Sequence, residues 1–170
     1  MKLKRLTLCG LLTALAIVLS IAERLFPLDA VIPVPGVKLG LANVVTLFAL
    51  TRLQPRDALA ILVCRVALSS LLLGSITGFL FSMTGGLLSL LVMQALLHIE
   101  GRFCSLLGVS VAGAAAHNIG QIIAAIFWMG TGAVIAYLPF LLVMAVPLGL
   151  VTGLTCSVAL SHLKKINFSV

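Results

Sequence analysis

Long apolar runs with almost no charge constrain this chain more than any other feature. Between Asp57 and Glu100 the one charged side chain is Arg65. Over the whole chain 62% of the residues are hydrophobic and 9% are charged, whereas soluble domains average roughly 45–50% and about 25%. A chain of this size cannot bury so much apolar surface in one soluble core. The sequence therefore predicts an integral membrane protein rather than a soluble enzyme, a nucleic-acid-binding protein or a disulfide scaffold.

The net charge and the cysteines agree with that interpretation. The charge of +7 comes from basic residues at the ends of apolar runs, not from a patch that could bind nucleic acid. The cysteines are far apart and form no CxxC pair, so neither a metal cluster nor a disulfide framework is expected. They are Cys9, Cys64, Cys104 and Cys156.

Charges and turn residues divide the chain into candidate membrane spans, each requiring roughly 20 apolar residues. The predicted fold is an all-α bundle of six transmembrane helices in one domain over residues 1–170. The spans cover about residues 6–22, 39–51, 58–73, 79–97, 103–128 and 133–161.

The second span is short, because its 13 residues rise only about 20 Å against a hydrocarbon core of about 30 Å. Backbone exposed to lipid cannot complete the crossing, so residues 31–38 must be sheltered by helices or line a cavity. The preceding Pro-rich segment, 27–36, could be a lid over a binding pocket or a plain interfacial loop. Both interpretations remain open.

The basic residues predict the orientation. With six spans both termini face one side, and two basic residues, Arg24 and Lys38, face the other. The excess of Lys and Arg places both termini in the cytoplasm, with the chain in the cell membrane. The residues on the side of the termini are Lys2, Lys4, Arg5, Arg52, Arg56, Arg102, Lys164 and Lys165.

Small residues recur at every fourth position on three of the expected helices, which lets helix backbones approach closely in lipid. The stripes on the last two helices are expected to pack inside the bundle. The stripe on the first helix could pack there or face a partner subunit. The stripes are Gly10 and Ala14; Ala112, Ala116, Gly120 and Ala124; and Ala145, Gly149, Gly153, Ser157 and Ser161.

Polar side chains inside the expected spans are candidate functional residues, because such groups are costly in a bilayer. Arg65 lies near mid-span, and the acids of the chain lie at span ends, so no acidic partner is expected for it. An outward-facing pocket would place this arginine where a carboxylate or phosphate could bind it. Alternatively, the same polar residues only lock helices together. The candidate substrate-binding residues are Lys38, Asn43, Arg65, His117, Asn118 and Gln121.

The sequence lacks the residue patterns that several kinds of catalysis and metal binding require. No GxxxxGK[ST] motif is present, so ATP hydrolysis by a P-loop is not expected. The scattered acids cannot form the paired carboxylate sites that hold magnesium and diphosphate. His98, His117 and His162 lie at different depths and make a poor metal site. The sequence predicts no catalytic site, no metal and no cofactor, and hence a protein that is not an enzyme.

Four stretches carry a family resemblance: VPGVKLGLANVVTLFAL (34–50), PRDALAILVCRVALSSLLLGS (55–75), FLFSMTGGLLSLLVM (79–93) and GVSVAGAAAHNIGQ (108–121). Together they resemble the Gx transporter family, which is also called heptaprenyl diphosphate synthase component I. The resemblance covers most of residues 5–160, and the runs KLGLAN and AAAHNIGQ are its most specific parts.

That family is in turn similar to the substrate-binding S components of energy-coupling factor (ECF) transporters. S components are six-helix membrane proteins with a site near the outer face, covered by the first outer loop. They dock through a small-xxx-small motif of the first helix onto a transmembrane coupling subunit with two ATPase subunits. The resemblance implies docking at Gly10 and Ala14, a small-molecule substrate and contact with membrane lipids.

The name of a synthase conflicts with the residues, because prenyl diphosphate synthases use aspartate-rich motifs and this chain has two aspartates, Asp29 and Asp57. The hypothesis is therefore a substrate-binding subunit of an uptake transporter for a small anionic or vitamin-like compound. The alternative is a non-catalytic scaffold or accessory component of a prenyl diphosphate synthase or a redox assembly.

Overall fold

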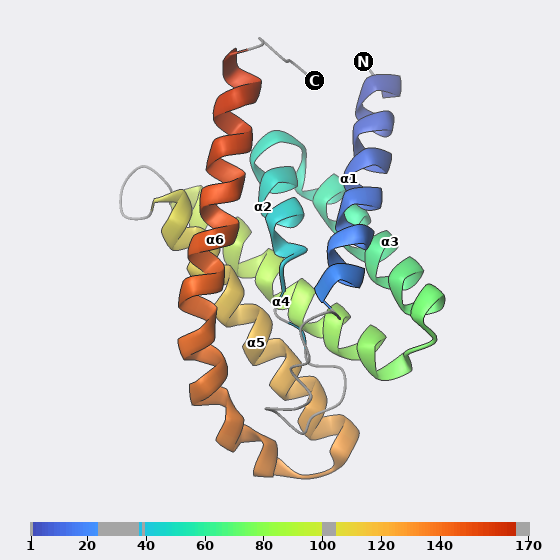
Figure 1. Cartoon of the computed structure of the whole chain (residues 1–170), viewed down its shortest axis with the longest axis vertical. Coiled ribbons are helices and arrows are strands. Elements are labelled where there is room, and N and C mark those ends of the chain that lie inside the picture. The colour runs from blue at the N-terminus through green and yellow to red at the C-terminus, as the bar shows by residue number, and fades with distance from the viewer. Residues whose placement is uncertain (1, 24–37, 39, 100–104, 166–170) are drawn as a thin grey trace.

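Every regular element in the described part of the chain is helical. The computed structural model describes residues 2–23, 38, 40–99 and 105–165. In chain order (Figure 1) the elements are α1 (Lys2–Ala22), α2 (Asn43–Arg52), α3 (Pro55–Leu73), α4 (Ile76–Ile99), α5 (Leu106–Met129), the 3-10 helix η3 (Gly132–Tyr137) and α6 (Leu138–Lys165). The prediction of an all-α fold is confirmed for these residues.

Four helical segments are long and apolar enough to cross a membrane: Leu3–Ala22, Ile76–His98, Leu106–Met129 and Gly132–Leu163. The surface of the bundle carries many exposed large apolar side chains, among them Leu71 and Phe127, which are 80% and 85% exposed. Lipid is the solvent that such a surface fits, so this is a membrane protein. Crossing by α2 and α3 stays a prediction.

Two of the expected spans have different bounds in the structure. The span expected at 39–51 is a helix of only 10 residues that begins at Asn43, because Gly40 has a φ of +83° that no helix accommodates. The span expected at 133–161 is divided into η3 and α6 at Leu138. The Pro-rich segment 27–36 lies outside the described residues.

The positions of the two ends of the chain are consistent with an even number of membrane crossings. The N-terminal end of α1, the turn between α2 and α3, and the C-terminal end of α6 lie towards the same end of the molecule (Figure 1). Which side of the membrane that end faces stays a prediction. Arg24 and Arg102, which entered the charge count, lie outside the described residues.

Small residues pack α5 against both α4 and α6, as the stripes predict. Gly120 of α5 lies against the backbone of Gly85 on α4, and Gly149 of α6 lies against the backbone of Val111 on α5. The stripe on α6 does not continue to Ser157 and Ser161, which are exposed. In that part of α6 the buried position is Cys156, one residue before Ser157, so the buried face of the helix has shifted off the stripe.

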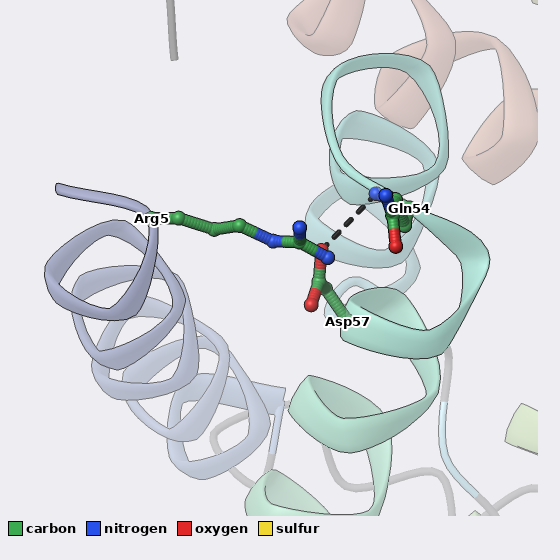
Figure 2. Close-up of polar contacts among 3 residues, drawn as sticks. All are labelled: Arg5, Gln54 and Asp57. Carbon is green, nitrogen blue, oxygen red and sulfur yellow. Dashed lines mark hydrogen bonds and ion pairs between the residues drawn. The ribbon is translucent and has the colours of Figure 1, made fainter. Parts of the chain in front are cut away.

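An ion pair joins α1 to the start of α3 (Figure 2). The Nη2 and Nε atoms of Arg5 lie 2.6 Å and 2.8 Å from Oδ2 of Asp57. The same Oδ2 accepts the backbone N–H of Gln54 at 3.1 Å, which satisfies one of the unpaired groups at the start of the helix. The carboxylate of Asp57 therefore caps the N-terminus of α3 and also holds α1 beside that helix.

Substitutions at Asp57 are expected to separate these two roles. Asp57→Asn removes the ion pair and should lower the free energy of unfolding by about 0.5–1 kcal/mol, since Arg5 is partly exposed. Asp57→Ala also removes the capping acceptor and should lower it by about 1–2 kcal/mol. Unfolding in detergent measures both values. Arg56→Gln, which removes a neighbouring exposed charge, is the matched control, and an equally large loss there would contradict the assignment.

Candidate functional site

Buried polar side chains from several helices converge on one region, called here the polar cluster. Its members are at most 5% exposed. The positive charge of Arg65 acts on both Glu23 and His117, and a Cβ added at Gly40 would meet both Asn43 and His117. Thus α2, α3, α5 and the residue that follows α1 meet in one place. The polar cluster consists of Glu23, Asn43, Arg65, His117 and Gln121.

Two of the three guanidinium nitrogens of Arg65 have no hydrogen-bond partner. It lies in the middle of α3, where Nη1 donates to the hydroxyl of Ser20 on α1 at 3.3 Å. The Nε and Nη2 atoms are buried and have no hydrogen-bond partner. Buried polar groups are normally paired, and leaving one unpaired costs about 1–3 kcal/mol or more. Such atoms are expected to meet a ligand or water.

The expectation that Arg65 has no acidic neighbour is wrong. Glu23, immediately after α1, is 5% exposed and near enough for its negative charge to act on Arg65. Its carboxylate also accepts the backbone N–H of Leu41. In the described part of the chain the ion pair within 4.0 Å is the one between Arg5 and Asp57. The carboxylate of Glu23 therefore partly balances the charge of Arg65 from more than 4.0 Å away, without a direct ion pair.

His117 lies between two glycines. A Cβ at Gly40 would lie 3.0 Å from Cδ2 of His117 and 3.1 Å from Nδ2 of Asn43. A Cβ at Gly85 of α4 would lie 2.9 Å from Nδ1 of the same ring. No ring nitrogen of His117 and no amide atom of Asn43 makes a hydrogen bond of good distance and angle, although the main chain of Gly85 lies close enough to the ring to act on it. The glycines thus enclose the ring on two edges while its polar atoms stay unused.

The side chain of Gln121, at the edge of the polar cluster, binds the backbone of Lys38. Its Oε1 accepts the backbone N–H of Lys38 at 2.8 Å, and its Nε2 donates to the carbonyl of Lys38 at 2.9 Å. This two-way pairing fixes the non-helical backbone that leads into α2. The ammonium of Lys38 extends towards the start of α4, where it lies 4.0 Å from the Cβ position of Gly78.

Asn118 does not join the polar cluster. Its Nδ2 donates to the carbonyl of Leu141 on α6 at 2.7 Å, so this residue holds two helices together. Of the predicted site residues, the polar cluster contains Asn43, Arg65, His117 and Gln121. Lys38 lies beside the cluster through its backbone contacts with Gln121, and Asn118 bonds to α6 instead.

Gly10 and Ala14 lie on the exposed face of α1. A Cβ at Gly10 would meet nothing within 4 Å in the described residues. Packing inside the chain therefore does not account for this pair, whereas it does account for Gly120 and Gly149.

Sequence reasoning missed Ser20, Glu23, Gly40 and Gly85. A usable signal was present for the first two: Leu12 and Ala16 form the buried stripe of α1, and the same spacing leads on to Ser20 and Glu23. No local signal marks the glycines as walls of a site, since their role depends on which helix lies opposite.

An open hollow of about 530 Å³ lies between the end of α3 and the start of α4. Its lining is almost entirely apolar. Ser75, one of the lining residues, and the ammonium of Lys38 both lie within 4.0 Å of the Cβ position of Gly78. The lining residues are Ala67, Ser70, Leu71, Gly74, Ser75, Ile76 and Phe79. Among the residues that the structure describes, no group of three or more His, Cys, Asp and Glu side chains could hold a metal ion.

One comparison with known proteins gives a match. A family model described as heptaprenyl diphosphate synthase component I matches residues 12–159, a range that contains the whole polar cluster. No curated protein and no solved structure matches the chain.

Proposed function

This chain belongs to the heptaprenyl diphosphate synthase component I family, and we propose that it is the substrate-binding subunit of an ECF-type uptake transporter in the cell membrane. One observation carries the proposal: Asn43, Arg65 and His117 hold six polar atoms that are buried and unpartnered. Residues that only locked helices together would use those atoms on each other, as Asn118 does on α6. A small ligand from outside would satisfy them.

Energy for uptake would come from partner proteins. The chain has no P-loop motif with which to hydrolyse ATP. The resemblance to S components implies that a transmembrane coupling subunit and two ATPase subunits provide this energy. The exposed pair Gly10 and Ala14 on α1 supports this role, because the stripe is open and would let a partner helix approach closely. The family name itself implies that the chain is one component of a complex.

The protein is proposed not to be an enzyme. Magnesium-dependent prenyl transfer needs several free carboxylates, but Asp57 is occupied by Arg5 and by the backbone of Gln54. Glu23 accepts the backbone N–H of Leu41. Both described acids therefore already hold the fold together.

The family name favours a second candidate, a non-catalytic membrane component that assists a prenyl diphosphate synthase or a redox assembly. Affinity purification from native membranes separates the two. A coupling subunit with ATPases supports the transporter, and a soluble synthase or a flavoprotein supports the accessory role.

Ligand retention tests the proposed function. The protein is purified in mild detergent, and the small molecules that it retains are extracted and analysed by mass spectrometry. We expect one species to be enriched with the wild type and lost in the variant Arg65→Met/His117→Leu. Ser110→Ala is the matched control, because it removes a buried polar group of α5 whose partner is Thr152 rather than the polar cluster. If the wild type retains nothing that the double variant lacks, the binding function is wrong.

A further inference from the structure

Three buried hydroxyls outside the polar cluster have no partner. They belong to Thr46 of α2 and to Ser82 and Ser89 of α4, are at most 4% exposed, and make no hydrogen bond in the described part of the chain. We propose that Thr46 and Ser89 form a second subsite of the binding site, called here the hydroxyl floor, which takes an uncharged polar group of the bound molecule. This inference rests on the proposed function and adds residues to it that lie beyond the polar cluster.

Hydroxyl groups elsewhere in the bundle show how a helix usually satisfies such a side chain. A Ser or Thr in a helix can donate to the carbonyl oxygen one turn earlier. Thr13, Thr84 and Thr152 do so at 2.8, 2.8 and 3.0 Å. The three unpartnered hydroxyls do not, although the preceding turn of each helix provides such a carbonyl. Because a buried polar atom without a hydrogen bond is costly, a group from outside the helix is expected to satisfy them.

The face of α4 that carries Ser82 and Ser89 also carries Gly85, which lies opposite His117. The two serines are seven residues apart and therefore share one face of the helix, with the glycine between them. A Cβ at Gly85 would lie 2.9 Å from Nδ1 of His117. Along α4, the histidine ring thus has an unpartnered hydroxyl about one turn away on each side.

Ser89 and Thr46 extend the polar cluster in the same direction. The hydroxyl of Ser89 lies 3.3 Å from the Cβ position of Gly113 on α5, and Gly113 precedes His117 by four residues, or about one turn. Thr46 follows Asn43 by three residues on α2, which packs against α4. Both steps run towards the end of the molecule that carries the turn between α2 and α3 (Figure 1). The hydroxyl floor therefore lies about one helical turn from the polar cluster.

Apolar side chains follow the hydroxyl floor in that direction. Leu47, Met93 and Val109 are buried together in one core cluster. Met93 follows Ser89 by four residues, and its sulfur lies 2.7 Å from the Cβ position of Gly113. The polar lining that begins at the polar cluster therefore ends at the hydroxyl floor.

The surroundings of the hydroxyl floor favour an uncharged group. No charged side chain occurs in residues 43–51, 76–97 or 106–116, which form the neighbouring parts of α2, α4 and α5. A buried ion without a counter-charge is strongly unfavourable. A hydroxyl both donates and accepts, so an alcohol, a carbonyl or an amide of the bound molecule can satisfy it. An ionised part of the same molecule would lie at Arg65 instead.

Retention of a small molecule by variants of the full chain tests the hydroxyl floor. The probe is the molecule that the wild type keeps on purification in mild detergent, measured by native mass spectrometry as the fraction of chains with a mass increment. We expect Thr46→Val and Ser89→Ala each to bind it roughly 3-fold to 10-fold more weakly. Thr46→Ser keeps the hydroxyl and should bind like the wild type. Thr84→Val is the matched control, because this hydroxyl of α4 is already bonded to the carbonyl of Leu80.

The unfolding temperature of the empty protein separates binding from packing. Wild type and variants are dialysed until no mass increment remains, and each is then unfolded by heat. Replacing a buried, unpartnered hydroxyl by an apolar group is neutral or stabilising, so empty Thr46→Val and Ser89→Ala should unfold at the wild-type temperature or above it. A variant that binds more weakly and also unfolds earlier when empty would contradict the inference, since its hydroxyl would then support the fold.

The outcomes distinguish the inference from the proposed function. Suppose that the wild type retains a molecule that Arg65→Met/His117→Leu loses, and that Thr46→Val and Ser89→Ala retain it in full. The hydroxyl floor is then wrong and the binding function stands. If the wild type retains nothing, both are wrong. Weaker retention by the two folded variants, with full retention by Thr84→Val, supports the hydroxyl floor.

Discussion

Replacing Arg65 with methionine is expected to weaken binding of the retained ligand by roughly 10-fold to 150-fold, the equivalent of about 1.5–3 kcal/mol for a hydrogen-bonded charge. Methionine has a similar length and no charge, so it fills the space without offering the two free donors. The loss should appear in the dissociation constant measured by titration of the ligand into the protein in nanodiscs.

Loss of binding must be separated from loss of fold, because Arg65→Met leaves the carboxylate of Glu23 buried without its cation. Removing one member of a buried charge pair is strongly destabilising. The double variant Arg65→Met/Glu23→Gln removes both charges, and the glutamine can still accept the N–H of Leu41. We expect it to recover the unfolding temperature but not the affinity. Wild-type affinity in either variant would mean that Arg65 does not touch the ligand.

The helices were predictable because this protein is surrounded by the apolar interior of a lipid bilayer. A bilayer requires long apolar runs, so α1, α4 and α5 begin and end close to the changes in composition. Gly120, Gly149 and Gly153 were likewise predictable as packing residues, because a stripe with a period of four on a helix faces one neighbour. Their close approach to other backbones confirms it.

The polar cluster was predictable in part. Arg65 and His117 are conspicuous in apolar runs, but Glu23 is not, since an acid at the end of a helix is expected to face water. Glu23 is nevertheless buried and accepts the backbone N–H of Leu41, a contact between residues 18 positions apart that the local sequence does not reveal. His117 and Asn118 are adjacent in sequence and point to different neighbours on the helix. Only the position of α6 decides that Asn118 is a packing residue.

The backbone that leads into α2 was not predictable from local sequence. Residues around Lys38 and Gly40 depart from the helix, and the groups that satisfy them come from Gln121 and Glu23, far away in the chain. Of the stretch 31–38, which was expected to be sheltered by helices or to line a cavity, the structure describes Lys38, whose backbone N–H and carbonyl both pair with Gln121. Which side chains would provide those partners depended on tertiary structure.

Gly120→Ala is expected to be among the most destabilising single substitutions in the bundle. A Cβ at Gly120 would lie 2.7 Å from Cα and 2.9 Å from N of Gly85, and 2.8 Å from the carbonyl oxygen of Thr84. All three atoms are main chain, so no side-chain rotation can relieve the contact and α4 must move away from α5. Overpacking of this kind costs about 1–3 kcal/mol, measured here as the loss in unfolding free energy in detergent.

The same substitution should also weaken ligand binding, because Gly85 lies opposite both Gly120 and the ring of His117 one turn away: a Cβ at Gly85 would lie 2.9 Å from Nδ1 of that ring. Separating α4 from α5 removes one wall of the histidine and changes where its nitrogens point. Gly10→Ala is the matched control: it makes the same chemical change in a helix, meets nothing within 4 Å, and should gain up to about 1 kcal/mol from helix propensity. Equal stability of the two variants would show that the close crossing of α4 and α5 is not what holds the site together.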